Sequence, residues 1–296
     1  MRKIYCLLGA VVLAAVGCSS AMIRAESEIR TDDDLKQYIR YLRSTDALDS
    51  LHSLRLHDTD ITDKGLRHLR PAKALKRLDL SFTAISDAGL KRLVALENLQ
   101  ALDLGGTAVT DAGMQAIADM PMLKELRLGR TAVSSEGLSA IAAMRQLEVL
   151  ELTQTAVDDA GVAALPRMRN LRVLYLSLTP ITDAALAHIA SVTSLEELVL
   201  WGVPLTDAGL RHLQALEQLS VLGLWDTGVS AAGVRHLAQM PKLESLDLGM
   251  TAVADDTVEI LGGMRGLRYV RLTDTRVTRQ ALGHLRRLLP DADIQW

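Results

Sequence analysis

The sequence predicts an α/β solenoid of ten repeats, shaped as a horseshoe with a parallel β-sheet on its concave face and helices on its convex face. A 24-residue period runs without a gap from residue 51 to residue 290. The first half of each unit reads L-x-x-L-x-L, and the second half spaces apolar residues by three, as along one stripe of a helix. Each unit opens with a leucine: Leu51, Leu75, Leu99, Leu123, Leu147, Leu171, Leu195, Leu219, Leu243 and Leu267.

The L-x-x-L-x-L segment is the predicted strand of each repeat. Its fourth and sixth residues share one side of the strand, because strand side chains alternate. Both are leucine in every copy except Val270 at the fourth position. One copy cannot bury so short an apolar face alone, so we expect the copies to stack as parallel strands about 4.8 Å apart.

A turn follows each strand at the ninth position, which is threonine in every copy but one. We expect the hydroxyl to bond backbone groups of its own and the adjacent coil, because buried polar backbone needs partners. Val203 replaces it once and lacks the hydroxyl.

The start of each helix is also visible in the sequence. Threonine followed by aspartate, as in Thr110-Asp111, predicts a helix whose first amides are capped by the hydroxyl and whose dipole is matched by the carboxylate. Glycine stands at the fifteenth position of most copies and is expected to allow close contact there. Three copies depart from it, with Ala185, Thr257 and Ala281.

These motifs resemble the leucine-rich repeat family over residues 51–290. The I-T-D-x-G-L helix start is similar to the subclass found in eukaryotic F-box adaptors and in many bacterial solenoid proteins. An F-box protein would be a substrate receptor of a ubiquitin ligase. The stretch between Cys18 and Leu51 is too short for an F-box, so we do not expect that function.

The segments outside the repeats have their own predicted roles. Residues 32–43 form an amphipathic helix pattern with Leu35, Ile39 and Leu42 on one face, and residues 32–50 are expected to cap the first repeat. The acidic run that starts at Asp32 is interpreted as a helix start rather than a calcium site. Residues 291–296 are expected to form a partial repeat at the other end.

Residues 1–17 are predicted to be a lipoprotein signal peptide. Arg2 and Lys3 precede an apolar run, residues 4–16, that is too short to span a bilayer. The segment ends in A-V-G-C, which resembles the bacterial lipobox except that Ala15 replaces the usual leucine. The resemblance implies that Cys18 is lipidated and that residues 18–31 form a short tether. The alternative is ordinary signal cleavage nearby, for example after Ala21, which would release a soluble exported protein.

Cysteine content and net charge limit the disulfides and the partners that the mature chain can have. The full sequence has two cysteines, Cys6 in the signal segment and Cys18 at its end, so the repeats hold no disulfide. Removing Arg2 and Lys3 leaves 31 basic and 36 acidic residues, a net charge of −5, which argues against nucleic acid as a partner. Under the sorting rule of enterobacteria, Ser19 favours the outer membrane, with the protein facing the periplasm or the exterior.

A candidate partner site lies on the concave face, where positions three, five, seven and eight of each copy are exposed. Trp201 and Trp225 occupy the same position in neighbouring copies, although aromatic residues make up only 3% of the chain. Trp and Tyr are favoured anchors of interfaces. The expected site comprises an apolar patch and an acidic border: Tyr175, Val199, Trp201, Trp225, Glu151, Glu197, Asp226 and Asp247. Gly223 is expected to leave a hollow beside the rings, and the alternative is that bulky residues only cover the sheet.

No metal site, cofactor or catalytic activity is expected. Five histidines share the eighteenth position, but neighbouring helices pack about 8–10 Å apart, whereas Zn–N bonds are about 2.0–2.1 Å. We interpret them as partly exposed helix residues: His68, His188, His212, His236 and His284. Sequence motifs of common nucleophile, phosphate-binding and zinc sites are missing.

The sequence therefore predicts a non-catalytic, membrane-tethered scaffold of the bacterial cell envelope that binds a protein or peptide on its concave face. The alternative is a structural envelope component that contacts cell-wall polymer or spaces other proteins.

Overall fold

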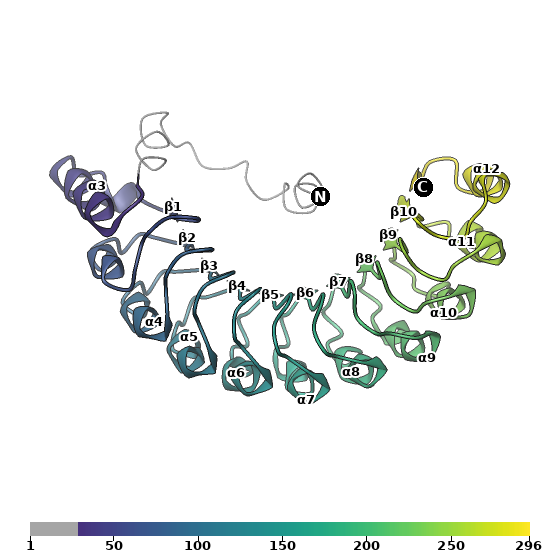
Figure 1. Cartoon of the computed structure of the whole chain (residues 1–296), viewed down its shortest axis with the longest axis horizontal. Helices are drawn as coiled ribbons and strands as arrows, with labels where there is room; N and C mark the ends of the chain where they lie inside the picture. Colours follow the sequence, from purple (N-terminus) through teal and green to yellow (C-terminus); the bar gives the residue numbers. More distant parts are fainter. Residues whose placement is uncertain (1–28) are drawn as a thin grey trace.

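The computed structural model describes residues 29–296, which form an open arc (Figure 1). One parallel sheet lines the inner side of the arc with its strands in chain order, and the helices lie along the outer side. This is the predicted solenoid. The strands are β1 (Ser53–Arg55), β2 (Arg77–Asp79), β3 (Ala101–Asp103), β4 (Glu125–Arg127), β5 (Val149–Glu151), β6 (Val173–Tyr175), β7 (Glu197–Val199), β8 (Val221–Gly223), β9 (Ser245–Asp247), β10 (Tyr269–Arg271) and β11 (Asp293–Gln295).

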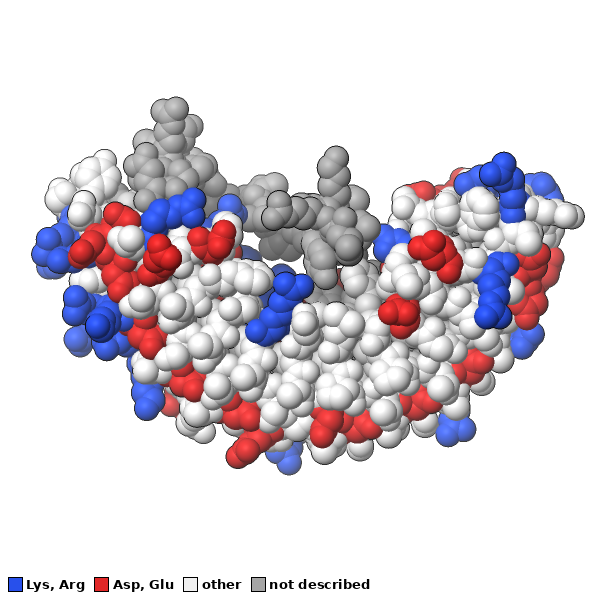
Figure 2. All heavy atoms as spheres, in the orientation of Figure 1, with Lys and Arg blue, Asp and Glu red and all other residues white. Residues whose placement is uncertain are grey.

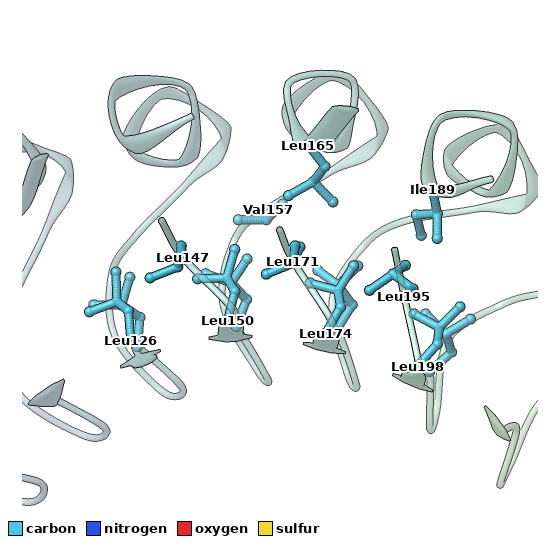
Figure 3. Packing of buried hydrophobic residues seen from close by; sticks show 14 of the residues in the cluster. Leu126, Leu147, Leu150, Val157, Leu165, Leu171, Leu174, Ile189, Leu195 and Leu198 are labelled. Carbon is cyan, nitrogen blue, oxygen red and sulfur yellow. The ribbon is translucent and has the colours of Figure 1, made fainter. Parts of the chain in front are cut away.

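The strands pair in the register that the period predicts, with Leu150 opposite Leu126 and Leu174. Leucines from the first and fourth positions of successive repeats stack into rows that point toward the helices (Figure 3). Leu150 and Leu152 are fully buried, as are their equivalents along the chain. The core is thus a continuous aliphatic layer between sheet and helices.

The helices vary in length and type from one repeat to the next. The α-helices are α3 (Asp32–Ser44), α4 (Asp87–Leu93), α5 (Met114–Ala118), α6 (Ser135–Ile141), α7 (Asp159–Val162), α8 (Asp183–Ile189), α9 (Asp207–Leu210), α10 (Ala231–Leu237), α11 (Val258–Gly263) and α12 (Arg279–Leu288). Short 3₁₀ helices complete the outer side: η1 (Leu48–Ser50), η2 (Gly65–Leu69), η3 (Asp111–Gly113), η4 (Leu165–Arg167), η5 (Arg211–Ala215) and η6 (Asp255–Thr257).

Helix α3 corresponds to the amphipathic pattern at residues 32–43. The Thr31 side chain caps it, and Asp34 reaches back to the Thr31 amide, which completes a capping box. Leu35, Ile39 and Leu42 are buried, and α3 contacts η2 of the first repeat. The acidic run at Asp32 is therefore the first turn of a helix.

The threonine of each turn bonds its own coil. Its hydroxyl donates to the carbonyl of the sixth-position leucine, as from Thr155 to Leu152 at 2.7 Å and from Thr179 to Leu176 at 2.6 Å. The prediction of a bond within the same coil is confirmed. In the seventh repeat the Leu205 amide donates instead to the carbonyl of Val203, at 2.7 Å.

The eighth residue of every repeat has a left-handed backbone. Glycine, which tolerates this conformation without strain, occurs there only at Gly106 and Gly202. The other eight repeats carry side chains: Asp58, Phe82, Arg130, Gln154, Leu178, Asp226, Met250 and Asp274.

A ladder of carboxylates joins the starts of the helices, and we call it the aspartate ladder. The aspartate at the thirteenth position of one repeat accepts two hydrogen bonds from the twelfth residue of the next. In the pair Asp207–Ser230, the Ser230 amide donates to Oδ1 at 2.7 Å and the Ser230 hydroxyl donates to Oδ2 at 2.6 Å. Six further pairs share this pattern: Asp63–Ser86, Asp87–Thr110, Asp111–Ser134, Asp159–Thr182, Asp183–Thr206 and Asp255–Thr278.

Helix α3 supplies the first member of the ladder. Asp32 accepts from the Thr62 amide at 2.8 Å and from the Thr62 hydroxyl at 2.7 Å. Figure 2 shows acidic residues recurring along the arc from one end to the other. The sequence predicted these aspartates as partners of helix dipoles, and the structure adds that they connect each coil to its successor.

Two joints between repeats depart from this pattern. Between the fourth and fifth repeats the residue types are exchanged, because the Ser135 hydroxyl donates to Asp158 at 2.5 Å and the Asp158 amide donates back to Ser135 at 3.0 Å. Between the eighth and ninth repeats both residues are alanine, Ala231 and Ala254, so these bonds are missing.

The fifteenth-position glycines lie against the ladder. A Cβ atom at Gly209 would come within 2.4 Å of Asp183 Oδ1, and one at Gly233 within 2.4 Å of Asp207 Oδ1. In the ninth repeat Thr257 replaces this glycine. The thirteenth residue of the eighth repeat, which would lie against it, is Ala231 and has no carboxylate. Ala185 and Ala281 also stand there, and the bonds at their joints persist.

Candidate functional site

The concave face changes character along the arc. On its N-terminal half, Glu125 accepts from Arg127 at 2.6 Å and lies 3.4 Å from Arg77, which forms an ion-paired row across β2 and β4. Burial raises the pKa of the neighbouring Asp103 carboxyl to about 6. The aromatic residues of the predicted site lie further along the arc, in or directly after β6, β7 and β8.

Tyr175 and Glu197 form the first part of the predicted site. They extend from the neighbouring strands β6 and β7, and the Tyr175 hydroxyl donates to Glu197 Oε1 at 2.8 Å. Burial raises the pKa of the Tyr175 phenol, and the Glu197 charge adds to the shift. Burial also raises the pKa of Glu197, against the lowering effect of the bond from Tyr175. The two side chains are thus a coupled, half-buried pair.

Trp201 and Trp225 follow β7 and β8; the ring of Trp201 lies over the end of β8, and the ring of Trp225 lies over the turn that follows β9. A Cβ atom at Gly223 would lie 2.5 Å from Trp201 Nε1, and one at Gly249 would lie 2.1 Å from Trp225 Cε3. The expected hollow at Gly223 is therefore wrong, because the indole of Trp201 fills that space. Val199 is only 6% exposed, since its Cγ1 atom crowds the same position.

Arg271 completes a cluster that the sequence analysis missed. Its guanidinium lies 5.6 Å from the centre of the Trp225 ring and 5.8 Å from that of Tyr269. It donates to the Tyr269 hydroxyl at 3.1 Å and to Asp247 Oδ2 at 3.0 Å. The Arg271 and Asp247 side chains are 16% and 10% exposed, so this cation is held between two rings by a buried carboxylate.

The acidic border that the sequence predicted is mostly engaged within the protein. Glu151 accepts from the Gly129 and Thr153 amides, both at 2.8 Å, and Asp247 accepts from the Gly249 amide at 3.0 Å. Burial raises the pKa of Asp247, although its bonds to Gly249 and Arg271 oppose the shift. Asp226 alone of the four acids is exposed, and it makes no ion pair within residues 29–296.

The other predicted sites lie outside the described residues or on the outer side of the arc. Cys18 and the signal segment lie outside the described residues. His188 is exposed, whereas His68, His212, His236 and His284 are half-buried on the outer side. Within the described part of the chain, no group of three or more histidine, cysteine or acidic side chains is arranged to hold a metal ion. No helix among residues 29–296 is long and apolar enough to cross a bilayer.

Comparison with known proteins identifies the repeat architecture. A family model described as "Leucine-rich repeat region" matches residues 35–287. A comparison with curated proteins gave no match.

Three solved structures illustrate the likeness of fold. The internalin InlF from Listeria monocytogenes is 20% identical with a TM-score of 0.50, and the match covers 88% of this chain and 94% of that one. Internalin C2 from the same organism is 21% identical with a TM-score of 0.50, over 88% and 92% of the two chains. A structure described as a TDR receptor is 14% identical with a TM-score of 0.53, over 85% of this chain and 48% of that one.

Proposed function

The chain belongs to the leucine-rich repeat family, and from this premise we propose that it is a non-catalytic scaffold that binds a protein or peptide on the C-terminal half of its concave face. Leucine-rich repeat proteins generally act as protein-binding scaffolds, and their curved sheets provide extended binding surfaces. The observation that carries the proposal is the cluster of Trp225, Tyr269 and Arg271 on that face, with Trp201 seated on Gly223 in the neighbouring strand.

The cluster has the properties of an interface anchor. The Trp225 ring is seated on the backbone at Gly249 and stacks with a guanidinium, so little side-chain freedom is lost when a partner covers it. Interfaces concentrate their binding energy in such fixed aromatic and arginine residues. The N-terminal half of the face offers ion-paired charges instead, which typically adjust association rate and specificity.

The proposal includes a lipid anchor at Cys18 in the bacterial cell envelope, at the outer membrane. It rests on the lipobox-like sequence and on the absence of any other cysteine after Cys18. Replacing Cys18 by serine should abolish incorporation of labelled palmitate and move the protein out of the membrane fraction. Unchanged membrane fractionation of the Cys18→Ser chain would refute the anchor without touching the binding proposal.

Affinity capture tests the binding site. The purified full-length chain, immobilised, should retain a defined protein from extract of its native envelope, and that protein should then be identified and its affinity measured. The double variant Trp201→Ala/Trp225→Ala should keep its cooperative unfolding and lose at least about thirty-fold in affinity, the usual effect of removing interface anchors. Undiminished affinity of this variant means that the site lies elsewhere.

A matched control is available on the same face. The variant Arg77→Ala/Glu125→Ala removes an ion pair from the N-terminal half and should leave the affinity within about threefold of the parent. Retention of cell-wall polymer in place of protein, lost in the tryptophan variant, would favour the alternative function of a structural envelope component.

A further inference from the structure

We propose that the binding surface continues from the concave face onto the edge of the sheet, where Leu178, Trp201, Trp225 and Met250 form an apolar rim that takes an apolar peptide segment carrying basic residues. This inference rests on the proposed function and specifies the partner's chemistry. The sequence placed Leu178 in the apolar stretch of repeats five to eight but not among the anchors, and Met250 was not expected to take part.

The rim is continuous through four successive repeats. The Leu178 amide donates to the Trp201 carbonyl at 2.8 Å, the Gly202 amide to the Trp225 carbonyl at 2.8 Å, and the Asp226 amide to the Gly249 carbonyl at 2.9 Å. The Leu178 side chain leans over Gly202, because a Cβ atom there would lie 2.6 Å from Leu178 Cδ2. Trp225 likewise leans over Gly249, the residue before Met250. Leu178 and Trp225 thus each cover a glycine beside the next apolar member, and Trp201 covers Gly223, two residues before Trp225.

The presence of large apolar side chains at Leu178 and Met250 favours neither the solubility nor the stability of the protein. Their side chains are 55% and 46% exposed, so they contribute little to the core. Their backbones are left-handed, with φ of 55° and 53°. Bulky side chains are disfavoured in that region, and five of the other repeats place glycine or aspartate at the same position. Three others carry Phe82, Arg130 and Gln154, of which Phe82 is also apolar and exposed but lies in the second repeat, away from the two tryptophans. Strained and exposed apolar residues at one place indicate a surface kept for contact.

Charge selects the occupant of the rim. Asp226 directly follows Trp225 in the eighth repeat. Met250 holds the same position as Asp226 in the ninth repeat, and Asp274 holds it in the tenth. Both carboxylates are exposed, and neither makes an ion pair or a side-chain hydrogen bond within residues 29–296. The nearby Arg271 is already bonded to Asp247. Arg276 is also exposed, two residues beyond Asp274. Between Leu178 and Met250 the free charge of the rim is that of Asp226 and is negative, and a segment that alternates apolar with basic side chains complements it.

The test exploits the left-handed backbone. Leu178→Gly/Met250→Gly should raise the midpoint of thermal unfolding, because glycine relieves the strain, and should weaken binding about tenfold. A variant that only damaged the fold would lower both the unfolding midpoint and the affinity. A second variant, Leu178→Asn/Met250→Asn, keeps a residue suited to left-handed backbone and removes the apolar surface, so it should bind as weakly.

The control is Gln154→Gly, at the same left-handed position of a repeat outside the rim. It should also raise the unfolding midpoint and should leave binding unchanged. The common background is the full chain with Cys18→Ser, and binding is followed by fluorescence anisotropy. The probes are three short labelled peptides that alternate leucine with lysine, leucine with glutamate, and serine with lysine.

We expect the leucine–lysine peptide to bind best, with Asp226→Asn weakening it about threefold. Equal binding of the leucine–glutamate peptide, no binding of the leucine–lysine peptide, or unchanged binding by the double glycine variant would each overturn the inference. If the captured envelope partner needs Trp201 and Trp225 but not Leu178 and Met250, the rim fails and the concave site stands. If it needs neither pair, the concave site fails as well.

Discussion

The joint between the fourth and fifth repeats and the joint between the eighth and ninth break the same pattern in opposite ways. At the first, serine and aspartate have exchanged places: the bond between the two side chains now runs from Ser135 to Asp158, whereas the amide of Asp158 still donates to the preceding repeat. At the second, Ala231 and Ala254 are both without a polar side chain. The comparison teaches that the two positions act as one unit, in which both members change together.

At the second joint, the missing carboxylate is accompanied by a change at the glycine position. Thr257 fills the place where glycine usually lies against the carboxylate, and its buried hydroxyl has no hydrogen-bond partner among the described residues. A buried polar group without a partner costs free energy. The outer side of the solenoid is therefore expected to be less tightly joined here than at the exchanged joint.

The largest expected effect is the loss of stability on removing a core leucine, and it should be the same at both joints. Leu152→Ala and Leu248→Ala each remove a fully buried side chain from the repeat that follows one of the two joints. Each should lower the free energy of unfolding by about 2–5 kcal/mol, since both leave a cavity in the same aliphatic layer. Urea denaturation measures it, with the exposed Glu217→Ala as a control within about 0.5 kcal/mol of the parent. If the two leucine variants differ by several kcal/mol, the core also differs between the joints.

The second prediction would remove the difference between the joints. The variant Ala231→Asp/Ala254→Ser/Thr257→Gly rebuilds the carboxylate, its hydroxyl partner and the glycine that makes room for them. We expect the free energy of unfolding to rise by about 1–2 kcal/mol, because two bonds to a carboxylate form and the unpartnered hydroxyl is gone. Hydrogen exchange should slow at the amide of the serine introduced at position 254. A loss of stability would mean that the alanine joint is packed for its own side chains.

The third prediction extends the comparison to the inner side of the solenoid. Val203 is buried where the other repeats have threonine, so the Leu200 carbonyl lacks the hydroxyl that its equivalents receive. Val203→Thr should stabilise the fold by about 1 kcal/mol if the hydroxyl donates to Leu200. A lower unfolding midpoint would show that the turn, which uses the bond from Leu205 to Val203, does not accommodate the donor.

The smallest net effect is expected at the exchanged joint. Ser135→Asp alone would place two carboxylates face to face, and Asp158→Ser alone would leave two hydroxyls, so both single variants should unfold at lower temperature than the parent. The double variant Ser135→Asp/Asp158→Ser restores the arrangement of the other joints and should return the midpoint to the parent value. A double-mutant cycle by calorimetry reports the coupling, and additive single effects would contradict a paired unit.

The leucine layer was predictable because each of its positions recurs every 24 residues and is buried in every copy. The aspartate ladder was not, because its partners lie 23 residues apart and occupy different positions of the repeat, as Asp207 and Ser230 do. Ser135 and Ala231 look like unrelated exceptions when each position is inspected alone. Only the pairing across the joint relates them to Asp158 and Ala254.

The candidate site divides in the same way. Trp201 and Trp225 stood out because the aliphatic core does not require aromatic residues. Arg271 was missed because its contact with Trp225 spans two repeats and depends on the reach of a long side chain. The acidic border was predicted as free charge, yet Glu151 and Asp247 accept from amides of turns whose geometry the sequence does not display.

The aspartate ladder also gives the solenoid a direction and a length. Except at the exchanged joint and the alanine joint, each coil lies against a carboxylate of the coil before it, beginning with Asp32 in α3. Thr278 of the tenth repeat donates to Asp255 of the ninth, but the tenth repeat carries Arg279 at the position where most earlier repeats carry an acid. A further coil would meet a cation at that place, so the row of carboxylates that begins in helix α3 stops at the tenth repeat.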